Sequence, residues 1–239
     1  MRVFPPWTRI RGHHRRQGLA STLVWLTEFY GGYLAVFKWR YLDMHYYRCE
    51  IPEEVPMLPP KVPVTMEGMS AEHVERMRPW LPPGKAELFL ERLEAGKHGL
   101  VCILAGEIAY FTWITNRDEY ESVSKEWIRL APGEGYLFDS FCRPEYRGLG
   151  LHSFMNAARL QRMRGIGCHR ALVGVTTTNF SARWALHGNG LRAHHRVVIV
   201  EMGKKKYRRK MKPLLLKWER NVRGGAGSKN ERGSGGAAG

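Results

Sequence analysis

The sequence predicts one α/β (α+β) domain, in which helices flank a mixed, twisted central sheet, with basic extensions at both ends. Three observations support this fold class. Short apolar runs of strand length alternate with segments whose apolar residues recur at helical spacing. A strand-like run from Gly135 to Phe141 leads through a glycine turn into an amphipathic segment that continues to Gly165. The 239 residues, 44% of them hydrophobic, suffice for one folded core plus extensions.

The composition changes along the chain and divides it into three parts. Residues 1–60 form a basic and apolar extension that ends in a proline-rich linker from Cys49 to Lys61. Residues 61–203 form the domain. Residues 204–239 form a basic run followed by a glycine-rich tail, whose composition is typical of disorder.

The N-terminal extension contains an apolar segment from Leu19 to Trp39 behind an arginine-rich stretch. This outline fits a membrane-spanning helix, an interfacial or self-association helix, or a helix packed on the domain. Glu28 would be costly in lipid, and no small-residue cleavage site follows. We therefore favour a helix packed on the domain.

The first half of the domain is expected to contain a strand, two helices and a hairpin. Ser70 is a suitable N-cap for the first helix, and the prolines and glycine of residues 82–84 must end it by Trp80. Gly96 closes the second helix, and the hairpin strands are rich in β-branched and aromatic residues. The expected ranges are a strand at 62–66, helices at 70–80 and 85–95, and hairpin strands at 100–104 and 108–114. Residues 115–132 are polar and give no clear prediction.

The second half is expected to alternate strands and helices. A strand at 136–142 precedes the glycine turn, and a helix follows the turn as far as Gly165. A strand at 171–177 then leads to a short helix that Asn179 can cap and Gly190 can end. A strand at 194–202 completes the domain.

The glycine turn has the features of a phosphate-binding site. Gly148 and Gly150 allow positive φ, and the helix after them has apolar residues at Leu151, Phe154, Met155 and Ala158. A strand, a glycine turn and a helix start leave unpaired backbone N–H groups at the positive end of a helix dipole. Such a place binds phosphate.

Two well-known phosphate motifs do not match this turn. A P-loop would need a lysine after the glycines, and none is present. A dinucleotide fingerprint would need a third glycine where Ser153 stands, and an acidic residue about 20 positions later, where residues 168–178 have none.

The segment Arg147-Gly-Leu-Gly-Leu-His152, preceded by Pro-Glu-Tyr, resembles the R/Q-x-x-G-x-G/A motif that binds acyl-CoA in the GNAT family of N-acetyltransferases. His152 departs from the motif by replacing its final Gly or Ala. Residues 179–191 are similar to the later element of that family, N-x-x-A-x-x-L-Y-x-K-x-G-F, with Asn179, Ala182 and Gly190 in register. The resemblance covers residues 61–203.

The resemblance implies acetyl-CoA, or another acyl-CoA, as co-substrate, and no metal. It implies that the turn holds the pyrophosphate and that the end of the preceding strand lies beside the acyl group and the pantetheine arm, with Asn179 near that arm. The residues expected to bind the cofactor are Phe141, Cys142, Arg143, Arg147, Gly148, Leu149, Gly150, Leu151, His152, Ser153 and Asn179.

The resemblance also implies direct attack of an amine on the thioester, helped by a base and an acid. Asp139 is the candidate base, because it is an acid in an otherwise apolar strand; Glu107 and Glu134 are less well placed. Leu186 stands where members of the family often have a tyrosine that acts as the general acid. His187 is the neighbouring candidate acid, although one helical step turns it by about 100°.

The acceptor is expected to be a small-molecule or peptide amine. The basic ends and the net charge of +16 also suggest contact with a polyanion or an anionic membrane. Four cysteines without a C-x-x-C pair, and histidine pairs rather than ligand clusters, indicate neither a zinc site nor a disulfide framework. We expect a cytoplasmic protein, with peripheral membrane association as an option. Two alternatives remain: a GNAT-like CoA- or partner-binding domain with impaired catalysis, and a polyanion- or membrane-associated binding protein.

Overall fold

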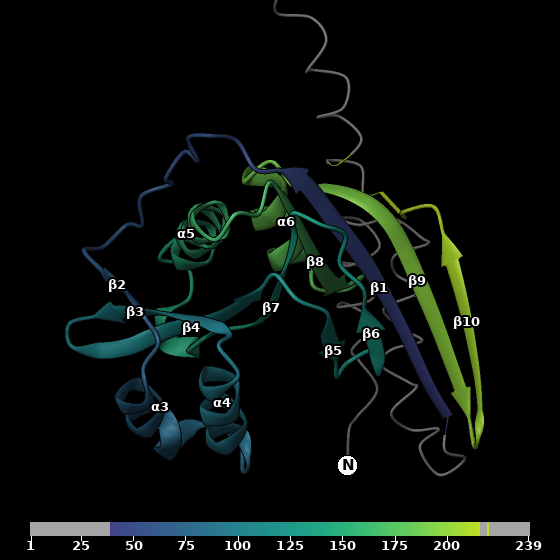
Figure 1. Cartoon of the computed structure of the whole chain (residues 1–239), viewed down its shortest axis with the longest axis horizontal. Coiled ribbons are helices and arrows are strands. Elements are labelled where there is room, and N and C mark those ends of the chain that lie inside the picture. The colour runs from purple at the N-terminus through teal and green to yellow at the C-terminus, as the bar shows by residue number, and fades with distance from the viewer. Residues whose placement is uncertain (1–38, 216–218, 220–239) are drawn as a thin grey trace, which may run out of the picture. The chain divides into compact units, whose positions relative to one another are not determined.

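The computed structural model describes residues 39–215 and residue 219 (Figure 1). The predicted apolar segment 19–39, apart from its last residue, and the glycine-rich tail lie outside this part of the chain. The chain divides into two compact units, one of residues 44–195 and one of residues 1–43 with 196–239. Each unit is described by itself.

The larger unit is built on a mixed sheet, as predicted, with strand order β9-β1-β8-β7-β4-β3-β2. Strands β7 and β8 are parallel, whereas β1–β8, β2–β3, β3–β4 and β4–β7 are antiparallel. Strands β1 and β9 each have part of their length in this unit. The bounds are β1 Trp39–Glu50, β2 Thr65–Gly68, β3 His98–Leu104, β4 Glu107–Thr115, β7 Glu134–Cys142, β8 Arg170–Thr176 and β9 Arg192–Met202.

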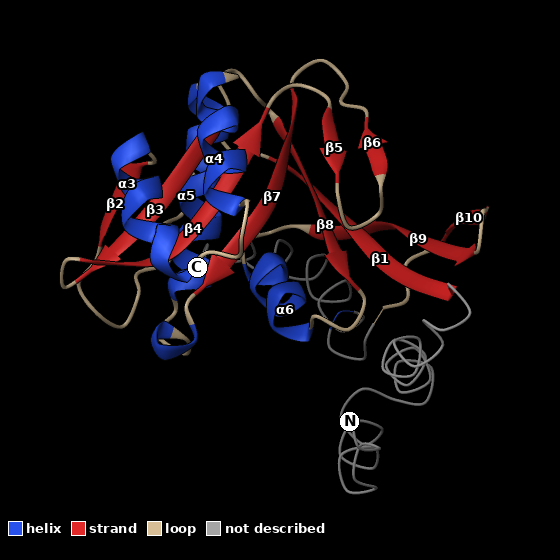
Figure 2. Ribbon diagram, turned by 90° about the horizontal axis from the view of Figure 1, so that it is seen from below, coloured by secondary structure: helices blue, strands red, loops and turns tan. Residues whose placement is uncertain are grey.

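Helices cover both faces of the β2-β3-β4-β7 part of the sheet (Figures 1 and 2). Helices α3 (Ala71–Met77) and α4 (Lys85–Glu94) pack on one face, where Val74, Phe89 and Trp113 belong to one buried cluster. Helix α5 (Leu151–Gly165) packs on the other face and buries Leu151 and Met155 against Tyr110. Helix α6 (Phe180–Gly188) contacts α5. Two short 3₁₀ helices, η2 (Arg78–Trp80) and η3 (Pro144–Tyr146), complete the unit.

Most predicted elements of the domain are confirmed within a few residues at each end. Ser70 caps α3 as expected, although the last predicted turn, at 78–80, is the 3₁₀ helix η2. The strand expected at 62–66 begins only at Thr65, which follows Pro63, a residue without a backbone N–H to pair in a sheet. The ambiguous polar segment contains a small hairpin, β5 (Glu119–Glu121) and β6 (Glu126–Ile128).

The sequence analysis missed β1. It placed a helix up to residue 39 and a linker from Cys49, but residues 44–50 pair with residues 170–176 of β8. The aromatic and charged residues of this stretch alternate too irregularly to identify a strand, although most of its side chains are buried in the structure.

In the smaller unit, β9 forms a hairpin with β10 (Lys205–Met211), and the two strands pair from Met202 with Lys205 to Arg196 with Met211. Arg196 of β9 forms an ion pair with Asp43 of β1. The sequence analysis placed residues 204–212 outside the domain as a basic run, and residues 205–211 of this run form β10. Pairing with β9 satisfies their backbone groups, while every side chain of β10 stays exposed.

Two irregularities of the larger unit determine where a ligand can enter. Strands β7 and β8 pair only between Glu134–Leu137 and Arg170–Val173, so their carboxyl ends diverge. Strand β7 also contains a β-bulge, because Asp139 and Ser140 together stand opposite Thr112 of β4. Asp139 has a φ of +46°, a left-handed conformation that suits the first residue of such a bulge.

Candidate functional site

The turn between β7 and α5 has the backbone conformation that its sequence predicts. Gly148 and Gly150 have φ of +81° and +82°, and Gly150 is the residue before α5. A side chain at either position would be strained by its φ, and the side of Gly148 where a Cβ would stand is open space. The turn therefore lies open beside the start of a 15-residue helix.

The amides of this turn are available to a ligand. Within the described part of the chain, the N–H groups of residues 148–153 donate to no protein acceptor. The segment that packs beside the turn occupies one of its carbonyls and none of its N–H groups: the Lys61 N–H donates to the Leu149 carbonyl oxygen at 2.9 Å. Six donors without a protein acceptor among the described residues, at the positive end of α5, are an arrangement that suits an anion.

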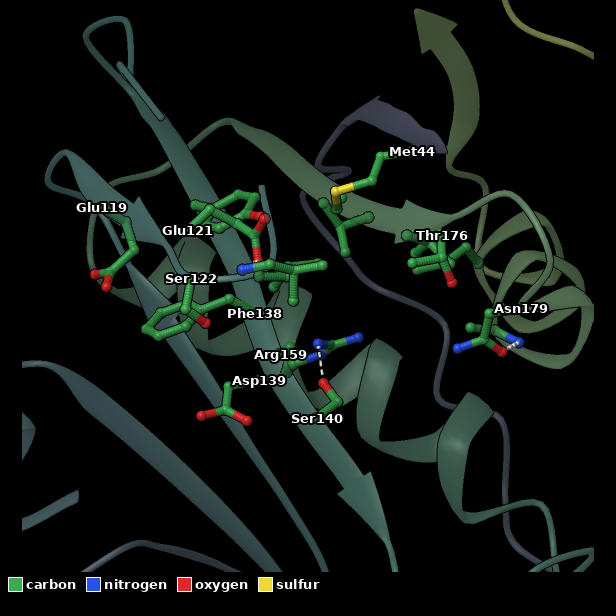
Figure 3. A pocket seen from close by; sticks show the side chains of 18 of the residues that line it. Met44, Glu119, Glu121, Ser122, Phe138, Asp139, Ser140, Arg159, Thr176 and Asn179 are labelled. Carbon is green, nitrogen blue, oxygen red and sulfur yellow. Dashed lines mark hydrogen bonds between the residues drawn. The ribbon is translucent and has the colours of Figure 1, made fainter. Parts of the chain in front are cut away.

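A cavity of about 360 Å³ lies where β7 and β8 diverge (Figure 3). Its lining combines residues of β7 and β8 with residues of α4, α5, α6 and the β5–β6 hairpin, all within the larger unit. Phe138 and Ser140 line it from β7, and Thr176 from β8. The side chains therefore reach the cavity from both faces of the sheet.

On the α4 side of the cavity, the bulge turns two consecutive side chains of β7 to the same helix. Arg92 lies over the ring of Phe138, 5.0 Å from its centroid, and its Nη1 donates to Asp139 at 2.5 Å. The Lys85 Nζ donates to the other carboxylate oxygen of Asp139 at 2.8 Å. Asp139, the predicted base, thus lines the cavity with both of its oxygens in ion pairs.

On the α5 side, polar groups form a buried cluster. The Arg159 Nη1 donates to Thr112 Oγ1 at 3.0 Å and to Ser140 Oγ at 2.7 Å, and Nη2 donates to Asn156. Burial lowers the pKa of the Arg159 guanidinium below its ordinary value. Figure 3 shows this guanidinium beside Ser140, among the residues that line the cavity.

His152 links the turn to this cluster. It belongs to the first turn of α5, and its imidazole lines the cavity, where Nδ1 lies 2.6 Å from the Tyr110 hydroxyl. Burial, with the nearby positive charge of Arg159 as a smaller cause, lowers the pKa of His152 to about 4. The imidazole is therefore neutral at pH 7, and its Nε2 is buried without a partner among the described residues.

Helix α6 brings two of its predicted residues to the cavity and not the third. Asn179 caps the helix by accepting from the Ala182 N–H at 3.2 Å, and it lines the cavity together with Leu186. His187 is buried elsewhere, where its carbonyl accepts from Arg192. The step of about 100° per residue explains the difference, so the structure does not bring His187 and Asp139 together.

The residues at the end of β7 alternate between the two faces. Phe141 stacks with Trp80 of η2, and Arg143 lies 5.4 Å from the centroid of the Trp80 ring. Cys142 instead packs with Leu149 against the α5 cluster. Of these three residues, Cys142 packs on the face of the turn and Phe141 on the other face, whereas Arg143 also lies 5.2 Å from the ring centroid of Tyr146, which packs with Cys142.

The sequence analysis missed Tyr110, Thr112, Ser140 and Arg159. The helical spacing could have identified Arg159 as a buried residue. It lies four residues after Met155 and eight after Leu151, on the apolar face of the helix. A charge at such a position is rarely buried without a partner.

The comparisons with known proteins agree on the fold. A model of the acetyltransferase (GNAT) family matches residues 66–188, a little more than half of the chain. No curated protein sequence matches. Among solved structures, a GCN5-related N-acetyltransferase from Sphaerobacter thermophilus is 15% identical, with a TM-score of 0.50 and coverage of 83% of this chain and 59% of that chain.

Two further solved structures match this chain. The glucosamine N-acetyltransferase region of a fungal multi-domain GH3 β-N-acetylglucosaminidase is 12% identical, with a TM-score of 0.52 over 71% of this chain and 22% of that one. A GNAT-family protein from Novosphingobium aromaticivorans is 17% identical, with a TM-score of 0.49 over 66% and 63%. The chain thus covers about three fifths of the first structures that it matches.

Proposed function

The chain belongs to the GNAT acetyltransferase family, and on this basis we propose that it transfers an acyl group, in the first instance acetyl, from acyl-CoA to a primary amine. The free amides of residues 148–153 carry this proposal, because they offer the pyrophosphate of CoA several donors at a helix N-terminus. Residues 147–153 would hold the pyrophosphate mainly through their backbone, and the open edge of β7 would lie along the pantetheine arm.

The divergence of β7 and β8 supplies the second requirement, a place for the thioester. Past Leu137, the edge of β7 that faces β8 has no strand beside it in the described chain, so N–H groups on this edge can donate hydrogen bonds to the thioester oxygen. The amine nitrogen attacks the carbonyl carbon, the C–S bond breaks, and the sulfur leaves with the electron pair as a thiolate. The amine loses one proton and the thiolate gains one, so an amide and CoA result.

The proton carriers are a finer part of this proposal. Asp139 remains our candidate for the base because it lines the cavity, but an oxygen must leave its ion pair with Lys85 or Arg92 before it can accept a proton. His187 has no such support, since it does not line the cavity. Because Leu186 replaces the usual tyrosine, a CoA-binding domain with impaired catalysis remains the alternative function.

A screen of amines for release of CoA from acetyl-CoA tests the proposal. We expect release with at least one class of amine (small amine, amino sugar, peptide terminus or lysine) and a rise of Tm with acetyl-CoA, because a ligand that binds only the native state stabilises it. A rise of Tm without CoA release from any amine would favour the impaired domain. No change of Tm would contradict CoA binding itself.

We further propose that the β9–β10 hairpin binds an anionic polymer. Strand β10 and its flanks carry seven lysines and arginines between residues 204 and 212, and all side chains of β10 are exposed. Heparin affinity of the variant K205Q/R209Q/K210Q should fall, with a weaker dependence on salt. The rise of Tm with acetyl-CoA should stay, and unchanged heparin affinity would reject this surface.

A further inference from the structure

Arg159 is a buried cation with no acidic partner in the part of the chain that the structure describes. It is 1% exposed, and no acidic side chain of the described residues forms an ion pair with it. A buried charge is normally paired, because removing it from water is costly and an opposite charge must offset this cost. In Arg159, only neutral oxygens of Thr112, Ser140 and Asn156 accept hydrogen bonds from the guanidinium.

The hydrogen bonds of Arg159 leave part of the guanidinium unused. A guanidinium has five N–H donors, and the three hydrogen bonds leave Nε–H and one hydrogen of Nη2. Nε is buried and has no partner among the described residues. Nε–H and the adjacent Nη2 form one edge of the planar group, and this edge matches the two oxygens of a carboxylate.

The acids that line the cavity are engaged elsewhere. Asp139 pairs with Lys85 and Arg92 on the α4 side. Glu119 pairs with Lys97. Glu121 accepts from backbone N–H groups of its own hairpin, those of residues 123 and 124. No acid of the lining is therefore left over for Arg159 within the described chain.

We propose that Arg159 anchors a carboxylate that a substrate brings into the cavity. This inference rests on the proposed acyl transfer, because the same cavity must hold the reacting groups. The carboxylate belongs either to the acyl group, as in a dicarboxylic monothioester, or to the acceptor, as in an α-amino acid. In both cases it stays ionised and is not consumed, while the amide forms and CoA leaves.

Three variants distinguish an anchor from a structural arginine. R159M replaces the charge by an apolar chain of similar length and removes the donor of Thr112, Ser140 and Asn156. R159K keeps the charge and loses the two-pronged edge. N156D supplies a carboxylate from the neighbouring residue of α5, and thus occupies Arg159 internally.

The measurement compares matched substrates that differ only in a carboxylate. One arm compares succinyl-CoA with butyryl-CoA as donors, and the other compares alanine with ethylamine as acceptors, by the rate of CoA release. The wild type should prefer the carboxylate-bearing member of one pair by about 10- to 100-fold, since a charge-assisted pair in a dry site has this strength. R159M and N156D should abolish the preference, and R159K should retain only part of it.

Binding of free acids gives a readout that does not need CoA. Calorimetric titration with succinate and with N-acetylglycine should show binding to the wild type and not to R159M or N156D. Binding of unacylated CoA, which depends on the turn, should persist in all variants. Failure of CoA binding in the wild type would reject the proposed function alone. An equal preference of the wild type and R159M for the carboxylate-bearing substrate, or no binding of free acids to the wild type, would overturn the role of Arg159. If R159M does not fold, the same comparisons with R159K and N156D test this role.

Discussion

The glycine turn and the cavity are neighbouring parts of one site, but they are built in different ways. The turn offers backbone N–H groups of consecutive residues, and its shape depends on two glycines with positive φ. The cavity is lined by side chains from helices and strands that are distant in sequence. A backbone site is therefore encoded locally and tolerates side-chain change outside its glycines, whereas a side-chain site depends on the packing of the whole unit.

The sharpest way to break the turn without touching the cavity is the variant G148V. We expect CoA affinity to fall by about a thousandfold, if three charge-assisted hydrogen bonds of about 1.5 kcal/mol each are lost. The reason is that Gly148 has a φ of +81°, which a β-branched residue resists. Titration with CoA measures the change.

The chain offers a matched control for this variant. Gly167 has a φ of +84°, and a Cβ there would also meet open space, but it lies past the C-terminal end of α5. G167V should cost a similar amount of stability and leave CoA affinity unchanged. Equal losses of affinity in G148V and G167V would show that backbone strain, and not the loss of the amide donors, explains the effect.

His152 belongs to both regions, and its titration reports on the cavity. Its pKa is about 4 in the folded protein, against an ordinary value of 6.5. The unfolded chain thus binds the proton first as the pH falls, so folding loses stability between about pH 6.5 and pH 4, by up to about 3 kcal/mol. Urea unfolding at several pH values should show this loss in the wild type.

H152Q lacks the titrating group and serves as the comparison. The difference in free energy of unfolding between H152Q and the wild type should change with pH in this window and be constant above it. His98, whose pKa burial also lowers, contributes equally to both proteins. Parallel pH curves for the two proteins would mean that the imidazole of His152 is not buried in this way.

Asp139 tests how far the cavity depends on charge balance. D139N should cost about 2 kcal/mol of stability, because it leaves Lys85 and Arg92 without their carboxylate; both are partly screened by water. Asparagine tolerates the φ of +46°, whereas D139A should lose about 1 kcal/mol more to backbone strain. Thermal unfolding measures both changes, and equal stability of D139N and D139A would argue against the strained bulge.

The smallest expected effect is at Asn179. N179A removes the N-cap of α6, where the side chain accepts from the Ala182 N–H, and should cost about 1 kcal/mol. Ser70 offers a matched cap at α3, on the face away from the turn. S70A should therefore cost a similar amount of stability without changing CoA affinity, and any larger loss of affinity in N179A would assign Asn179 a contact with CoA.

The difference between the regions also explains what the sequence could predict. The turn, its two glycines and the cap at Asn179 follow from local rules, and the structure has each of them where the sequence indicates. The direction of Asp139 could not be predicted, because it depends on a bulge that arises from the register between β4 and β7. Arg159 appears on an apolar face, but its partners Thr112 and Ser140 come from two strands whose pairing is not local.

The sequence analysis also missed the strands β1 and β10. The sequence analysis assigned only the two ends of β1, to a helix up to residue 39 and to a linker from Cys49, because the strand is revealed only by its pairing with β8, which lies more than 100 residues later in the chain. The basic run of β10 contains only Tyr207 and Met211 among its lysines and arginines, so neither alternation nor hydrophobicity distinguishes it from a solvated tail.

The seam between β7 and β8 has a mechanical consequence. Four residue pairs, from Glu134 with Arg170 to Leu137 with Val173, join these strands, and at their closed end Arg48 of β1 forms an ion pair with Glu134 of β7 at 2.6 Å. A small rotation about so short a seam would widen the mouth at the far end while both flanking cores stay intact. Departure of a bulky product would then need only slight pivoting, and seam amides should exchange with deuterium sooner than those of the β3–β4 pair.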